Sequence, residues 1–105
     1  MKRSYGIIWR RRDERVYAGR LEIGECTLRI LGSAPRRHAR VEEIPLSEIV
    51  AVGSVRDRTH RLRELPSVVI HLREGAPIFV ATVDATARSR ELAATLGARL
   101  GREAA

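Results

Sequence analysis

The clearest chemical feature of this sequence is a run of guanidinium groups between residues 10 and 15. The run is formed by Arg10, Arg11, Arg12 and Arg15. A guanidinium group donates two parallel hydrogen bonds to a phosphate or a carboxylate, so this spacing predicts an anion-binding segment. Asp13 and Glu14 interrupt the run, which favours a solvated turn whose charges pair with one another; diffuse attraction to acidic membranes or partners is a further alternative.

Two further basic groups occur later in the chain. Arg36 and Arg37 lie in a stretch that contains Gly, Ser and Pro, which is typical of a loop. The second group comes from another polar stretch and comprises Arg56, Arg58, His60, Arg61 and Arg63. Asp57 and Glu64 lie within or beside this second group, which favours local charge pairing over a binding site.

The formal net charge of +7 favours an anionic partner, which could be nucleic acid, acidic lipid or an acidic protein surface. All 20 basic residues except Lys2 are arginine, a bias that a GC-rich genome also produces. Nucleic acid is disfavoured, because single-strand binders stack bases on exposed aromatic rings. Tyr5, Trp9 and Tyr17 lie on predicted core faces, and Phe79 is the one ring that alternates toward solvent.

Catalytic and metal-binding motifs are absent from the sequence. His38, His60 and His71 lie in different segments, and none has metal-ligand spacing to Cys26. We therefore expect no enzyme activity and no cofactor. A lone cysteine fits a reducing compartment, and no apolar stretch approaches the roughly 18 residues that span a bilayer. These features predict a cytoplasmic protein, or one held peripherally at the inner face of the membrane.

The elements that must position these residues are seven short strands with alternating apolar and polar residues. They are expected over residues 5–10, 15–23, 26–31, 40–44, 46–55, 67–73 and 77–83. Gly24 at the first loop position predicts a type II′ turn between the second and third strands. The fourth strand is more polar and is ended by Pro45, so we expect it at a sheet edge. The fifth run is apolar on both sides, which predicts a strand covered on both faces.

A change of period marks a helix over residues 84–101, with Asp84 as its N-cap. Its apolar face is formed by Leu92, Leu96 and Leu100, which recur at spacing four. We expect this face to plug one end of a curved wall of strands, within a single domain over residues 1–105. Gly97 either permits a close approach to the sheet or is tolerated at about 1 kcal/mol relative to alanine.

Seven strands followed by one helix resemble the pleckstrin-homology-like (PH-like) fold, including the GRAM and small bacterial PH families. The best local marker is the segment 43–52, EIPLSEIVAV, which is similar to the I-P-L-x-x-I-x-x-V passage of bacterial members. Residues 19–23 and 27–30 likewise look like the second and third strands of these domains. The resemblance implies a barrel of about seven antiparallel strands in two near-orthogonal sheets, capped by the helix. Trp9 is the only tryptophan, so the final-helix tryptophan of many eukaryotic PH domains is absent.

The resemblance also carries expectations about function. It places Arg10, Arg11, Arg12 and Arg15 in the first inter-strand loop, where lipid-binding PH domains hold basic residues. Arg36 and Arg37 would lie in a loop at the same end. Small bacterial relatives often bind peptides, other proteins or themselves. We therefore expect a non-enzymatic binding module for protein interaction or self-association. The alternatives are peripheral binding to anionic lipid through the arginine loop and, less favoured, nucleic-acid binding.

Overall fold

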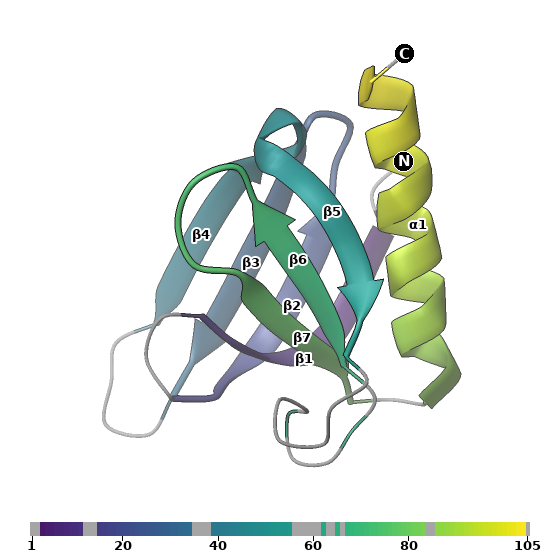
Figure 1. The fold of residues 1–105 in the computed structure, drawn as a ribbon. Helices are drawn as coiled ribbons and strands as arrows, with labels where there is room; N and C mark the ends of the chain where they lie inside the picture. The colour runs from purple at the N-terminus through teal and green to yellow at the C-terminus, as the bar shows by residue number, and fades with distance from the viewer. Residues whose placement is uncertain are drawn as a thin grey trace.

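A computed structural model of the protein describes residues 3–11, 15–34, 39–55, 62, 65, 67–83 and 86–104. Within these ranges the chain forms seven strands, one short 3-10 helix (η1) and one α-helix (Figure 1). In chain order the elements are β1 (Arg3–Arg10), β2 (Tyr17–Ile23), β3 (Thr27–Ser33), β4 (Arg40–Pro45), η1 (Leu46–Glu48), β5 (Ile49–Ser54), β6 (Val68–Leu72), β7 (Ile78–Thr82) and α1 (Thr86–Ala104). The prediction of a mainly β fold with a C-terminal helix is confirmed.

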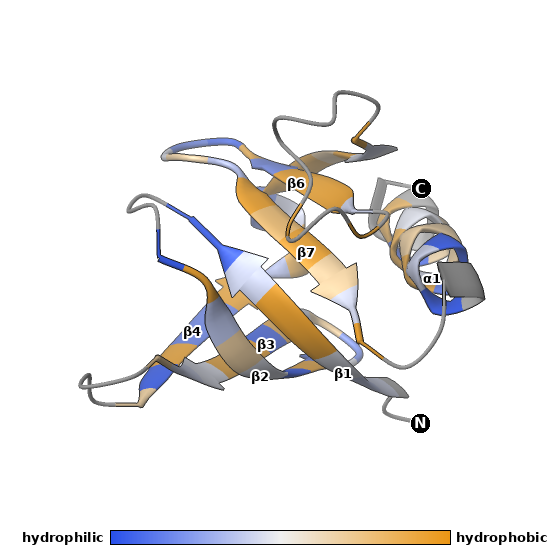
Figure 2. Ribbon diagram, turned by 90° about the horizontal axis from the view of Figure 1, so that it is seen from below, coloured by the Kyte–Doolittle hydropathy of each residue, from blue (hydrophilic) through white to orange (hydrophobic). Residues whose placement is uncertain are grey.

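The seven strands form one antiparallel sheet in the order β4-β3-β2-β1-β7-β6-β5. The sheet curls into a half-barrel, and α1 stands beside β5 (Figure 1). β4 and β5 are therefore the two edge strands, as predicted for β4. Figure 2 shows a mixture of hydrophilic and hydrophobic residues in β4 and mainly hydrophobic residues in β7.

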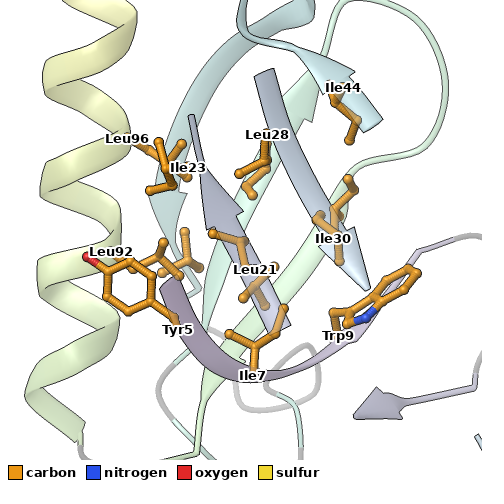
Figure 3. Close-up of a cluster of buried hydrophobic side chains, with 14 of the residues drawn as sticks. Tyr5, Ile7, Trp9, Leu21, Ile23, Leu28, Ile30, Ile44, Leu92 and Leu96 are labelled. Atoms are coloured by element: carbon orange, nitrogen blue, oxygen red, sulfur yellow. The ribbon is translucent and has the colours of Figure 1, made fainter. Parts of the chain in front are cut away.

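The main core fills the concave face of the sheet, because alternate residues of each strand point inward. Tyr5, Ile7 and Trp9 of β1 are all buried, as the alternation predicts. Leu92 and Leu96 of α1 are fully buried against this core, near Tyr5 (Figure 3). The leucine face of the helix thus covers one end of the half-barrel, and Trp9 lies at the far side from the helix.

The end of α1 differs from the sequence-based expectation, and the surroundings of Gly97 decide between the two alternatives for that residue. The helix continues to Ala104, beyond the expected end at residue 101, and Asp84 lies outside the described residues. Gly97 is exposed, and a Cβ atom placed there would meet no atom within 4 Å. Gly97 therefore gives no close approach to the sheet and is simply tolerated.

The turn between β2 and β3 also differs from the prediction. The N–H of Gly24 donates to the carbonyl of Thr27 at 2.9 Å, so Glu25 and Cys26 occupy the centre of the turn. Among the described glycines only Gly75 has a positive φ, at 91°. The expected type II′ turn, which requires a positive φ at Gly24, is therefore wrong.

β5 is not covered on both faces, contrary to the prediction. The one-turn helix η1 replaces the start of the expected strand, and the pairing with β6 shifts register between Ile49 and Ala51. Val50 is consequently 53% exposed, while Val52 packs against the core. A register irregularity changes which residues face inward, and simple alternation cannot anticipate it.

A second, smaller cluster lies apart from the main core. It consists of Ile8, Leu62 and Ala81, with Val16, Leu65 and Phe79 packed around them. The connection between β5 and β6, which the sequence suggested to be polar, thus buries Leu62. The N–H of Leu62 donates to Ser67 Oγ at 3.0 Å, and Ser67 Oγ donates to the carbonyl of Leu65 at 2.9 Å. Phe79 is half-buried here, which corrects its prediction as an exposed ring.

Candidate functional site

Arg11, from the predicted anion-binding run, is engaged by a glutamate of a distant strand. Arg11 Nη1 lies 2.7 Å from Glu42 Oε2, and the two side chains are only 16% and 13% exposed. Arg11 Nε also donates to the carbonyl of Ala76 at 3.5 Å. The Arg11 side chain therefore links the end of β1 to edge strand β4 and to the turn between β6 and β7.

A second guanidinium contacts the same carboxylate. Arg40 Nη2 lies 3.3 Å from Glu42 Oε1, and Arg40 Nη1 donates to the Tyr17 hydroxyl at 3.4 Å. The Arg40 guanidinium also lies over the Tyr17 ring, 5.7 Å from its centroid. Tyr17 in turn stacks on Trp9 at a centroid distance of 4.8 Å. We call Arg11, Arg40, Glu42 and Tyr17 the Glu42 cluster.

Glycine makes the aromatic base of this cluster possible. Trp9 Nε1 donates to the carbonyl of Leu31 at 3.3 Å. A Cβ atom on Gly32 would lie 2.5 Å from Trp9 Nε1 and 3.0 Å from Tyr17 Cβ. Gly19, which pairs with Gly32 in the β2–β3 ladder, would place a Cβ 2.0 Å from the Leu31 carbonyl oxygen. The two glycines thus permit close packing of β2, β3 and the indole, and the register at Gly19 has no bulge.

The contacts of the Glu42 cluster favour a structural role over ligand binding. Two guanidinium groups share one carboxylate, so one net positive charge remains. Each oxygen of Glu42 contacts one of the two guanidinium groups, so a phosphate at Arg11 would have to share that guanidinium with Glu42 or displace it. Breaking a largely buried ion pair is costly, and Glu42 would exchange its 2.7 Å contact with Arg11 for the longer, 3.3 Å contact with the more exposed Arg40.

Of the other predicted site residues, the structure describes Arg10 and Arg15. Arg10 lies over the Phe79 ring, 4.9 Å from its centroid, and thus beside the second hydrophobic cluster. Arg15 is exposed. Three predicted residues, Arg12, Arg36 and Arg37, lie outside the described residues, as do the basic residues between positions 56 and 63. Within the described part, the structure therefore separates Arg10 from Arg11 and does not form a shared anion site from them.

Sequence reasoning missed a small acidic hollow of about 290 Å³ at the β2–β3 turn. Its lining includes Glu22, Glu25, Cys26, Arg29 and Glu43. Glu22, Arg29 and Glu43 come from three neighbouring strands and are brought together by the pairing of Glu22 with Arg29 and of Arg29 with Glu43, whereas Glu25 and Cys26 lie in the turn. Arg29 Nε lies 3.6 Å from Glu43 Oε1, and both side chains are exposed.

The described residues contain no group of three His, Cys, Asp or Glu side chains suited to hold a metal ion. Across the same part of the chain, no helix has the length and apolarity needed to cross a bilayer.

The outer backbone edge of β4 is a further candidate binding surface. In the described part of the chain, β4 pairs with β3 alone. The Leu46 N–H donates to the Cys26 carbonyl at 2.9 Å, and this bond identifies which residues of β4 direct their backbone groups toward β3. Hydrogen-bonded and non-hydrogen-bonded pairs alternate in an antiparallel ladder, so Arg40, Glu42 and Ile44 bond to β3. Val41 and Glu43 direct their N–H and C=O groups away from β3.

We call the outward backbone groups of Val41 and Glu43, together with the Val41 side chain, the β4 edge. Pro45 also occupies an outward position, where its missing N–H costs the ladder nothing. The Val41 side chain is 51% exposed, one of three large hydrophobic side chains so exposed among the described residues. At the opposite edge of the sheet, α1 packs against β5 and η1 (Figure 1). The helix therefore leaves the β4 edge uncovered.

No protein-family model matches this sequence, and no curated protein matches it.

Proposed function

We propose that the protein is a non-enzymatic binding module of the PH-like type, which binds an extended protein segment along the β4 edge. The proposal is supported mainly by the backbone N–H and C=O groups of Val41 and Glu43, which point away from β3. In strand addition, such groups supply the main-chain hydrogen bonds, and neighbouring side chains supply the specificity. The exposed Val41 side chain offers an apolar contact at the same place.

The PH-like part of the proposal is supported by the order and shape of the elements. Seven antiparallel strands precede one helix, and the helix covers one end of the half-barrel. β1 pairs with β2 from Arg3 to Trp9 and with β7 from Ile7 to Arg10. β1 is thus common to both halves of the curled sheet, and we propose that these halves correspond to two near-orthogonal sheets.

Anionic lipid ranks second as a ligand. Glu42 occupies Arg11, and Arg10 lies over Phe79, which leaves Arg15 as the exposed member among the described arginines of the run. Nucleic acid ranks lower, because Tyr5, Trp9 and Tyr17 are buried and offer no platform for stacking bases. The lipid alternative is tested by co-sedimentation with phosphatidylserine vesicles. Unchanged sedimentation of a triple alanine variant at Arg10, Arg11 and Arg12 would discard it.

The proposed function is tested by selecting extended peptides from a displayed random library against the immobilised protein. Amide hydrogen exchange then maps the site of the best binder. We expect the Val41 and Glu43 amides to gain protection, because a docked strand would accept their hydrogen bonds. A library without binders, or binders that leave both amides in free exchange, would overturn the proposal.

A Val41→Pro variant sharpens this test. Proline removes the outward N–H of Val41, and the bonds from β4 to β3 remain because they come from the neighbouring residues. Loss of one hydrogen bond in the added strand predicts peptide binding weakened by about ten-fold. The melting temperature should stay close to that of the wild type. Peptide affinity that is unaffected by this change would place the binding site elsewhere.

A further inference from the structure

We infer that the β4 edge pairs with the same edge of a second copy of this chain, antiparallel, about a two-fold axis at Val41. This inference rests on the proposed function, because it names the occupant of the same edge. It follows from two features of β4: the outward direction of the Val41 and Glu43 backbone groups, and the order of charges along the strand, Arg40-Val41-Glu42-Glu43. A two-fold interface requires a surface that is complementary to itself, and β4 is complementary to its own copy in one register.

In the register centred on Val41, each cross-strand pair is compatible. Val41 faces Val41 of the partner subunit as a hydrogen-bonded pair, in which the two residues exchange both backbone bonds. Arg40 faces Glu42 of the partner subunit, and Glu42 faces the partner's Arg40. Opposite charges directly across a ladder stabilise it. Glu43 faces Ala39 of the partner subunit, a small residue that is exposed in the single chain.

Neighbouring symmetric registers fail for electrostatic or hydrogen-bonding reasons. An axis at Arg40, Glu42 or Glu43 sets that residue against its own copy, and like charges directly opposite each other destabilise a ladder. An axis at Ile44 sets Glu43 against Pro45, which has no N–H to donate. Among these registers, the one centred on Val41 therefore opposes no like charges and leaves no carbonyl of Val41 or Glu43 facing a proline without a donor.

The side chains at the β4 edge are placed for this contact. The Val41 side chain is 51% exposed in the single chain, and a facing valine would cover part of it. The Arg40 side chain is 39% exposed and contacts Glu42 of its own strand. Arg40 and Glu42 form non-hydrogen-bonded pairs across the axis, where Cα atoms come within about 4.5 Å. Two arginines and two glutamates would then alternate across the interface.

The pairing is short, because Pro45 and η1 end β4 on one side. We therefore expect a weak, concentration-dependent dimer. Sedimentation velocity between about 10 µM and about 1 mM protein covers the range of dissociation constants for such small contacts.

The decisive experiment uses two opposite charges at the axis. Val41→Lys and Val41→Glu each set like charges against each other, so each variant alone should dimerise at least about ten-fold more weakly than the wild type. A 1:1 mixture should recover association, because lysine then faces glutamate. Val50→Lys is the matched control, since Val50 is 53% exposed on the opposite edge strand, and its dimerisation should equal that of the wild type. Circular dichroism verifies that each variant is folded.

Each contrary outcome overturns the inference. These outcomes are a monomeric wild type at the highest concentration, single variants that dimerise like the wild type, a mixture that stays monomeric, or a Val50→Lys variant that loses the dimer. A monomeric wild type that still binds selected peptides at Val41 and Glu43 would remove the self-pairing and leave the proposed function intact. A dimer with the expected charge response would support both.

Discussion

Glu42→Gln is the substitution that most directly tests the assignment of Arg11 to the fold. The two carboxylate oxygens of Glu42 accept separately from Arg11 and Arg40, at 2.7 Å and 3.3 Å. Glutamine has nearly the same shape but offers one acceptor oxygen and one amide donor. One guanidinium therefore loses its acceptor at position 42, and the other loses the negative charge that it faces.

The size of the effect follows from the exposure of the three side chains. Arg11 and Glu42 are 16% and 13% exposed, so water cannot readily replace their contact. Arg40 is 39% exposed, and water recovers part of its loss. A hydrogen bond to a charged group contributes about 1.5–3 kcal/mol, and the mixture of one buried and one half-exposed contact predicts a loss of about 2 kcal/mol. For a domain of this size, the melting temperature should fall by roughly 8 °C or more.

Glu43→Gln provides the matched control, because it makes the same chemical change at the next residue of β4. Glu43 Oε1 lies 3.6 Å from Arg29 Nε, and these side chains are 64% and 47% exposed. Such surface pairs contribute little, so the expected loss is below about 0.5 kcal/mol. Urea unfolding of both variants, in low salt and in about 1 M NaCl, measures the difference. The loss at Glu42 should persist in salt, which screens exposed pairs far more than buried ones.

A double-mutant cycle with Arg11→Met isolates the Arg11–Glu42 contact from other consequences of each change. We expect a coupling free energy of about 1.5 kcal/mol between the two positions. A Glu42→Gln variant that is no less stable than Glu43→Gln, or a cycle without coupling, would show that Arg11 is available to a ligand after all.

Three further substitutions, one of them with a matched control, test the packing. Gly32→Ala should destabilise the protein by about 1–3 kcal/mol and change the near-ultraviolet circular dichroism of Trp9, since the new Cβ would lie 2.5 Å from the indole nitrogen. Gly53→Ala is the control and should cause neither change, because its Cβ has ordinary van der Waals space. Equal losses of stability in the two variants would refute this reasoning. Gly97→Ala should raise the free energy of unfolding by up to about 1 kcal/mol in urea titration, and any loss of stability would contradict the open surroundings of Gly97. Leu96→Ala should cost about 2–5 kcal/mol in the same titration, because Leu96 is fully buried, and a cost below about 1 kcal/mol would argue against the helix as the cover of the half-barrel.

Local periodicity in the sequence was enough to predict the order of the elements and most of their inward faces. Alternation follows from the backbone geometry of a strand, so it identified Tyr5, Ile7 and Trp9 as core residues without knowledge of their partners. The spacing of Leu92 and Leu96 likewise predicted the buried face of α1. The polar character of β4 and its ending at Pro45 marked it as an edge strand.

Tertiary structure alone decided what the charged and special residues contact. Arg11 meets Glu42, 31 positions later, only because the sheet curls and brings the end of β1 to β4. The register shift in β5, the burial of Leu62 and the need for glycine at Gly32 also depend on which distant segments pack together. Periodicity describes how a segment presents its own side chains. The partner of each side chain depends on strand order, register and curvature, which are properties of the whole chain.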